Sequence, residues 1–251
     1  MICVNNLNVG TRLLPMSFRC EQGSFLHIVG PNGSGKSTLL AALAGMISYQ
    51  GQICFGADDI SRLTIQDLAV RRAYLAQNER PVFAVDVYHY LMLSVPESLN
   101  MNHAEVSDVI RYLSERLHLQ DKLARSIHQI SGGEWQRVRL AGSCLQIWPS
   151  LNPDGQYLIL DEPSAALDVG QENLMYGLLD EIRSMGITIL MANHDLNRTY
   201  RNASHVVLLN QGILYRSGLP EEVLNAASIK EVFQTDVQAV DIKGKSYLLF
   251  D

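Results

Sequence analysis

The stretch that decides the fold is Gly30-Pro31-Asn32-Gly33-Ser34-Gly35-Lys36-Ser37-Thr38, which follows the apolar run Phe25-Leu26-His27-Ile28-Val29. Its spacing, G-x-x-x-x-G-K-S after a strand and before a helix, is typical of a loop that wraps the phosphates of a nucleotide. The glycines let backbone N–H groups turn inward at positive φ, and the dipole of the following helix attracts the anion. We expect Lys36 to pair with the β and γ phosphates and Ser37 to offer its hydroxyl to Mg²⁺. The chain is therefore predicted to bind a nucleotide.

The size of the chain fits either one large α/β domain or one core domain with an inserted subdomain, and in both cases it allows a substantial buried core. It has 251 residues, of which 47% are apolar, and a formal net charge of −6. No apolar run approaches the roughly 20 residues that cross a bilayer, and the start lacks a basic segment followed by an apolar one. We therefore expect a chain that stays in the cytosol. The negative charge gives no overall attraction to DNA or RNA, so we expect no nucleic-acid partner.

The cysteines predict neither a disulfide nor a metal site. Cys3, Cys20, Cys54 and Cys144 are far apart in the sequence and form no C-x-x-C pair. We expect four reduced, mostly buried thiols.

Hydrophobic patterns divide the chain into strand-rich and helical parts. Continuous apolar runs at 157–160 and 187–191 are typical of strands buried on both faces of a parallel sheet, with a helix expected at 171–183 between them. From 86 to 145 apolar residues recur every three or four positions, which predicts an inserted helical subdomain. Further strands are expected at 2–4, 18–20, 52–55, 73–76, 205–209, 213–215 and 246–250, and further helices at 38–46 and 220–225.

Two carboxylates stand where a buried strand is predicted to end, in Leu158-Ile159-Leu160-Asp161-Glu162. Such a position suits phosphoryl transfer. We expect Asp161 to hold Mg²⁺ and Glu162 to accept a hydrogen bond from the attacking water. Considered without the other motifs, the pair could equally be a surface acidic pair.

A second candidate phosphate-binding segment is Ser131-Gly132-Gly133-Glu134, which precedes a helical run. Backbone N–H groups and a serine hydroxyl at a helix start bind phosphate. Because one side of the nucleotide already faces the loop at Gly30, the economical arrangement is a head-to-tail dimer. In it each copy closes over the γ-phosphate bound by the other, so each site is shared.

Five motifs occur in a fixed order: the loop beginning at Gly30, Gln77, Ser131-Gly132-Gly133, Asp161-Glu162 and His194. In these motifs the chain resembles the ATP-binding cassette (ABC) family along essentially its whole length. The resemblance implies that Gln77 links Mg²⁺ and the attacking water to a membrane partner. It also implies that His194 contacts the γ-phosphate, although by residue type alone a histidine after an apolar strand is more often an ordinary loop residue.

The fold implied by the resemblance is α/β, with a P-loop NTPase core and a mostly parallel sheet. An N-terminal antiparallel β subdomain and an inserted α-helical subdomain complete it. We expect a single ABC ATPase domain over 1–251, in which 1–85 and 146–251 form the core with the β subdomain and 86–145 forms the helical signature subdomain.

Motifs and resemblance together predict three sets of site residues. The catalytic residues are Glu162, His194 and Gln77. The metal-binding residues are Ser37, Gln77 and Asp161. The ATP-binding residues are Gly30, Pro31, Asn32, Gly33, Ser34, Gly35, Lys36, Ser37, Thr38, Ser131, Gly132, Gly133 and Asp168, of which Asp168 is expected to contact the opposite subunit.

The chain departs from the family pattern at two places. Residues 5–14 contain no aromatic side chain, whereas family members often stack the adenine on one there. Glu134 stands where the signature commonly has glutamine, and its carboxylate near ATP would be repulsive unless it points away or meets a cation such as Arg137 or Arg139. Glu134 is therefore not included among the predicted ATP-binding residues.

Three segments narrow the resemblance to the ATPase subunits of vitamin B12 importers: 132–141, 152–156 and 194–197. It implies a complex of two copies of this chain, two membrane-spanning permease subunits and a periplasmic binding protein, at the cytoplasmic face of the inner membrane of a Gram-negative bacterium. ATP and Mg²⁺ are the implied cofactors. An ATPase of an iron-siderophore or haem importer is the nearest alternative. A soluble, non-transport ABC ATPase and a nucleotide-binding regulator without turnover are alternatives of other classes.

Overall fold

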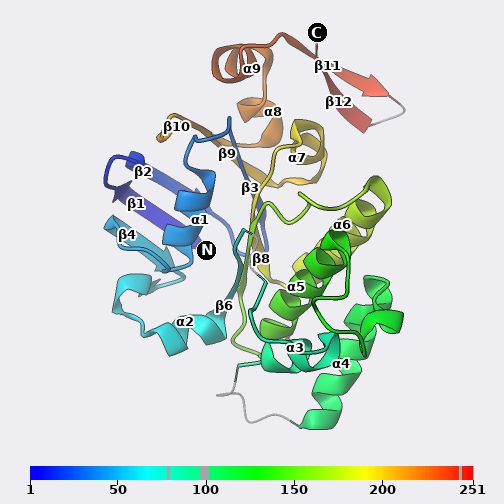
Figure 1. The fold of residues 1–251 in the computed structure, drawn as a ribbon. Helices are drawn as coiled ribbons and strands as arrows, with labels where there is room; N and C mark the ends of the chain where they lie inside the picture. Colours follow the sequence, from blue (N-terminus) through cyan, green and yellow to red (C-terminus); the bar gives the residue numbers. More distant parts are fainter. Residues whose placement is uncertain (78–79, 97–101, 243–244, 251) are drawn as a thin grey trace. The chain divides into compact units, whose positions relative to one another are not determined.

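The structure is a computed structural model that describes residues 1–77, 80–96, 102–242 and 245–250 (Figure 1). The chain forms two compact units. The first unit combines Met1–Leu63 with Thr188–Asp251, and the second unit is Thr64–Ile187. The predicted subdomain limits at 85/86 and 145/146 remain a prediction.

The N-terminal part of the first unit is an antiparallel sheet in the strand order β2-β1-β4-β5. The side chains of Ile2, Val4 and Leu7 in β1 are fully buried, and the other side chains of the strand are more exposed. This confirms the expected antiparallel β subdomain. The strands are β1 (Ile2–Val9), β2 (Leu13–Cys20), β4 (Gln50–Phe55) and β5 (Asp58–Asp59).

A second sheet in the first unit contains the strand that leads into the phosphate loop. β3 (Phe25–Val29) pairs in parallel with β8 (Thr188–Ala192) on one side and with β9 (His205–Asn210) on the other. β10 (Ile213–Gly218) returns antiparallel to β9, as the predicted hairpin requires. All five residues of β3 and of β8 are buried, because strands covered on both faces are apolar throughout.

The first predicted helix is shorter at its C-terminus than the sequence suggested. α1 covers Lys36–Leu43, whereas the expected range was 38–46. Gly45 has φ 68° and its N–H bonds to the carbonyl of Ala42, so the chain leaves the helix there through a left-handed residue.

The C-terminal segments of the first unit pack around a common apolar cluster that includes Val29, Leu208, Ile229 and Leu248. Three of these segments were not predicted: α7, α9 and β11. The elements are α7 (Leu196–Asn202), α8 (Pro220–Val223), α9 (Ala226–Phe233), β11 (Val237–Ile242) and β12 (Lys245–Phe250). A 3₁₀ turn at Ile60–Arg62 follows β5 in the N-terminal part of the unit.

The second unit joins two parallel strands to a set of helices. β6 (Arg72–Leu75) and β7 (Tyr157–Asp161) pair in parallel up to Leu75 and Leu160. The apolar spacing in the predicted helical insertion is confirmed by α3, α4 and α5, whose apolar faces are buried. The helices are α2 (Ile65–Arg71), α3 (Val87–Leu93), α4 (His103–Arg116), α5 (Gly132–Gln146) and α6 (Val169–Ser184), with a 3₁₀ turn at Gln120–Lys122.

Within the described ranges, no helix has the length and apolar character needed to span a bilayer.

The four cysteines are free thiols, as expected. Only Cys20 and Cys144 are buried, and Cys3 and Cys54 are partly exposed.

His27 is a histidine in the middle of β3 that is completely shielded from solvent. Its Nδ1 lies 3.0 Å from the hydroxyl of Thr199 on α7. Burial lowers the pKa of His27 to about 3, because the protein interior disfavours the charged imidazolium. The ring is therefore neutral in the folded protein at pH 7.

This burial predicts a pH dependence of stability. Below its ordinary pKa of 6.5 the ring binds a proton in the unfolded chain, whereas in the folded protein it stays neutral down to about pH 3. The free energy of unfolding therefore falls as the pH drops between these values. From roughly pH 6 to pH 5 the wild type should lose about 1 kcal/mol more than His27→Gln in urea unfolding. The exposed His103→Gln serves as control and should keep the wild-type slope. Equal slopes for the wild type and His27→Gln would refute this origin.

Candidate functional site

The predicted phosphate loop connects β3 to α1 in the first unit. Gly30, Gly33 and Gly35 have positive φ angles of 152°, 77° and 104°, at which the backbone of a residue with a side chain would be strained. A Cβ on Gly30 would lie 2.2 Å from the carbonyl oxygen of Leu209 in β9. Glycine is therefore required here both by the backbone conformation and by the approach of the neighbouring strand.

Lys36 is the first residue of α1, and its side chain is only 5% exposed. Its Nζ donates hydrogen bonds to the carbonyl oxygens of Gly30 at 2.9 Å and Pro31 at 3.2 Å. The ammonium group therefore folds back over the loop, where its charge adds to the positive end of the helix. This is the arrangement that an anion-binding loop requires.

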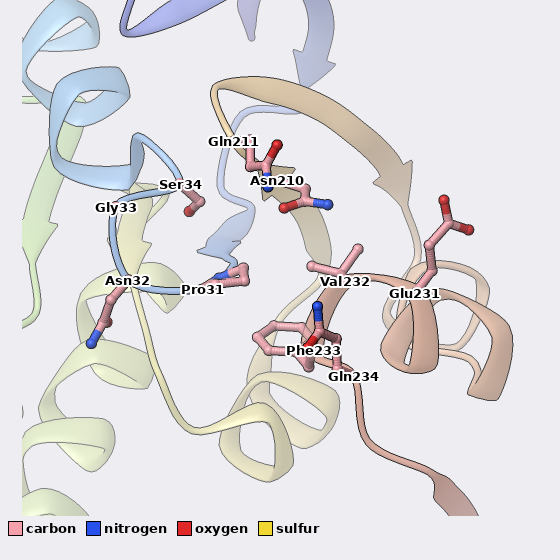
Figure 2. Close-up of a pocket in the computed structure, with 10 residues that line it drawn as sticks. All are labelled: Pro31, Asn32, Gly33, Ser34, Asn210, Gln211, Glu231, Val232, Phe233 and Gln234. Carbon is pink, nitrogen blue, oxygen red and sulfur yellow. The ribbon is translucent and has the colours of Figure 1, made fainter.

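The turn between β9 and β10 supports the loop from its other side. The N–H of Gly212 donates to the carbonyl of Ser34 at 3.1 Å, and the Gly212 carbonyl accepts from the N–H of Leu14 at 2.8 Å. A cavity of about 490 Å³ lies beside the loop (Figure 2). Amide side chains, one carboxylate and one aromatic ring line it, from Pro31, Asn32, Gly33, Ser34, Asn210, Gln211, Glu231, Val232, Phe233 and Gln234.

His194 lies beyond the end of β8, the parallel neighbour of β3. The N–H of Asn193 donates to the carbonyl of Ile28 at 3.1 Å, which holds the chain against β3 just before His194. His194 itself is exposed. Because parallel strands end at the same edge, the phosphate loop and His194 leave the sheet of the first unit on one side.

In the second unit, β7 ends at Asp161, which is 3% exposed, and Glu162 follows it. Glu162 has φ 51°, an uncommon conformation for a residue other than glycine and one that persists where the surroundings impose it. Gln77 follows β6, and its Nε2 donates to Oε2 of Glu162 at 2.9 Å. The second unit therefore brings together two of the predicted catalytic residues.

Ser131 is the N-cap of α5 and forms a capping box with Glu134. The Ser131 hydroxyl accepts from the Glu134 N–H at 3.2 Å, and the Glu134 carboxylate accepts from the Ser131 N–H at 2.7 Å. A Cβ on Gly133 would lie 2.9 Å from the carbonyl oxygen of Ala166, so the helix start packs closely against the segment after Glu162. The predicted helix start is confirmed.

Glu134 does meet a cation, as one of the two expected solutions required, but the cation is Lys122 and not Arg137 or Arg139. Its carboxylate lies 3.3 Å from Nζ of Lys122, whereas Arg137 donates to the carbonyl of Leu117 and Arg139 to that of Ala76. The Ser131 N–H and Lys122 both favour the ionised carboxylate and hold its pKa below the ordinary value. The S-x-x-E spacing at 131–134 is the sequence signal of this capping box, whereas Lys122 is joined to it only by folding.

Asp168 is the N-cap of α6, and its Oδ1 accepts from the N–H of Gln171 at 2.8 Å. Its side chain is exposed. The predicted site residues thus fall into two groups: the first unit holds the phosphate loop and His194, and the second holds Gln77, 131–133, 161–162 and Asp168.

Two residues with direct links to this group were not predicted, Gln136 and Arg139 on α5. Gln136 donates to the carbonyl of Pro163 at 3.0 Å, and Arg139 donates to the carbonyl of Ala76. Their partners are distant in the sequence, so no local pattern indicates them.

A glycine-rich loop with an inward lysine, a carboxylate pair at the end of a buried strand and a capped glycine-rich helix start are together typical of a nucleotide-hydrolysing protein. The model of the ABC transporter family matches residues 13–165. The chain belongs to this family. It is an ATP-binding, ATP-hydrolysing subunit whose hydrolysis is coupled to transport, and it works with membrane permease components at the periphery of the membrane.

Among its relatives is the vitamin B12 import ATP-binding protein BtuD of Vibrio cholerae serotype O1, which is 52% identical to this chain over 251 residues. The alignment covers 100% of both chains. The protein of that name from Vibrio atlanticus is 50% identical, again with both chains fully covered. A solved structure of the ATP-binding subunit of an ABC transporter has a TM-score of 0.80 at 21% identity, covering 93% of this chain and 98% of that one. This likeness confirms the predicted ABC ATPase fold.

The capping box predicts different effects for two substitutions of Glu134. Glu134→Ala removes the acceptor of the Ser131 N–H and should lower the free energy of unfolding by about 1 kcal/mol. Glu134→Gln keeps an oxygen acceptor and loses only the charge facing Lys122, which is a partly exposed pair, so the cost should stay below about 0.5 kcal/mol. Urea unfolding of both variants measures the difference. If the two variants are equally destabilised, the hydrogen bond to Ser131 is not the stabilising contact.

Proposed function

We propose that this chain is the ATPase subunit of an importer for vitamin B12. The observation that carries the proposal is the 52% identity to a protein named for vitamin B12 import, which extends over all 251 residues. The family model covers only 13–165, so the shared residues include the C-terminal third that lies outside it. The solute itself need not touch this subunit, which is expected to contact nucleotide and permease.

The roles of the first unit follow from its anion-binding geometry. The phosphate loop, from Gly30 to Thr38, would hold the triphosphate, with Lys36 beside the β and γ phosphates. His194, which leaves the same edge of the sheet, would contact the γ-phosphate. Binding the phosphates in this way requires only positive charge and N–H donors at the positions described.

The second unit would supply the hydrolytic residues. Glu162 would accept a proton from the attacking water, and Gln77, hydrogen-bonded to Glu162, would orient that water. The hydroxyl of Ser37, the amide oxygen of Gln77 and the carboxylate of Asp161 are hard oxygen donors of the kind that Mg²⁺ prefers. When bound, Mg²⁺ neutralises charge on the β and γ phosphates.

Two copies of the chain would share each ATP. The signature of one copy, Ser131-Gly132-Gly133, would face the triphosphate held by the other, and the exposed Asp168 would contact the opposite subunit. To shift the pair from 1:99 to 99:1 in favour of the closed state, ATP must favour closure by about 5.5 kcal/mol. Two sites that each bridge two subunits are a suitable source of that free energy.

We further propose that the complex contains two permease subunits and receives its solute from a periplasmic binding protein, with this chain at the cytoplasmic face of the inner membrane. In the segment after Gln77, Val82 is 100% exposed and Phe83 is 58% exposed. Exposed apolar residues of this kind suit contact with a permease segment, whereas core packing would bury them. We propose no nucleic-acid partner.

Glu162→Gln tests the hydrolytic role and the shared site together. The amide keeps the size of the side chain but cannot act as a base, so turnover should fall by at least about 100-fold. ATP should still bind and should accumulate a dimer, which is seen by light scattering after size exclusion. The exposed Glu115→Gln on α4 is the control and should turn over normally. Wild-type turnover in Glu162→Gln, or a monomer at saturating ATP, would contradict the proposal.

The solute is tested in the complex purified from membranes through this subunit. Mass spectrometry of the intact assembly identifies the permease and its copy number. The complex, reconstituted in liposomes with its binding protein, should take up cobalamin in an ATP-dependent manner. Uptake of a ferric siderophore or haem without cobalamin would overturn the proposed solute while leaving the ATPase role intact.

A further inference from the structure

The signature helix α5 carries two polar side chains that lie on one face, three residues apart. Gln136 is 6% exposed and Arg139 is 7% exposed. Nη1 of Arg139 donates to Oε1 of Gln136 at 3.3 Å, so the two side chains form one buried polar group. Buried polar groups of this kind hold their neighbours in place when they are satisfied by hydrogen bonds.

Each of these side chains also binds a backbone carbonyl next to a predicted catalytic residue. Nε2 of Gln136 donates at 3.0 Å to Pro163, which directly follows Glu162. Nη2 of Arg139 donates to Ala76, which directly precedes Gln77.

The hydrogen bond between Gln77 and Glu162, at 2.9 Å, closes a ring. The ring runs from Glu162 through Pro163 and Gln136 to Arg139, and returns through Ala76 to Gln77.

The ring begins just beyond the last paired residues of β6 and β7. Parallel pairing of β6 with β7 ends at Leu75 and Leu160. Beyond these residues strand pairing no longer sets the distance between the two segments. The φ of 51° at Glu162 is uncommon and needs external support, which the bond from Gln136 to the next residue can supply.

We propose that Gln136 and Arg139 are positioning residues that set the distance between Gln77 and Glu162. They thereby tie the geometry of this pair to the helix that begins with the signature Ser131. Because α5 is a continuous helix of 15 residues, a displacement of its N-terminus reaches both carbonyls. The inference rests on the proposed roles of Gln77 and Glu162 in hydrolysis.

The test measures ATP hydrolysis by the full-length chain with Arg139→Met and Gln136→Met, which keep bulk but lose the donors. We expect kcat to fall by about 10- to 100-fold while KM for ATP changes less than about twofold, since misplacement of about 1 Å affects the reaction more than binding. Arg139→Lys can still donate to Ala76 and should restore most of kcat.

A double-mutant cycle separates positioning from general stability. Gln77→Ala removes the residue that Arg139 is expected to position, so Arg139→Met combined with Gln77→Ala should be little slower than Gln77→Ala alone. The matched control is Arg137→Met on the same helix, whose guanidinium binds the carbonyl of Leu117. Its effect on kcat should add to that of Gln77→Ala. If Arg139→Met fails to fold, Gln136→Met with Gln77→Ala provides the same cycle.

Two results would overturn the inference: wild-type kcat in folded Arg139→Met and Gln136→Met, or full additivity of their effects with Gln77→Ala. Failure of the proposed function looks different. In that case the wild-type chain would not hydrolyse ATP, or Glu162→Gln would turn over normally, whatever the α5 variants do.

Discussion

Parallel pairing of buried strands is the constraint on which the candidate site depends. In the first unit it sets β3 beside β8, and in the second it sets β6 beside β7. Strands that run in parallel deliver the residues that follow them to a common edge. The phosphate loop and His194 therefore emerge together in the first unit, and Gln77 and Glu162 emerge together in the second.

Beyond the strand ends, position is set by close backbone packing and by hydrogen bonds to carbonyls. Gly30 has no room for a Cβ against Leu209, so the loop lies directly on the neighbouring strand. In the second unit Gln136 and Arg139 hold the carbonyls on either side of the Gln77–Glu162 pair. Neither device makes or breaks a bond in the proposed reaction, yet both fix where the reacting groups lie.

Glu134 illustrates how a local structural role can be taken for an electrostatic conflict. Near ATP its carboxylate was expected to be repulsive unless it pointed away or met a cation. In the structure its carboxylate caps the first turn of α5 and lies beside Lys122. The carboxylate therefore accepts a hydrogen bond at the start of the helix. The amide oxygen of a glutamine would have the same structural role at this position.

The sequence by itself determined the ABC ATPase class, the phosphate loop, the capped signature and the buried strands, because each depends on residues that are adjacent or regularly spaced in the chain. It missed α7, α9 and β11, which are short and gain their stability from a shared apolar cluster. Only the tertiary structure decided that Gln77 meets Glu162, 85 positions away, and that Arg139 meets Ala76. Such contacts arise from folding of distant segments, for which a local sequence pattern carries no signal.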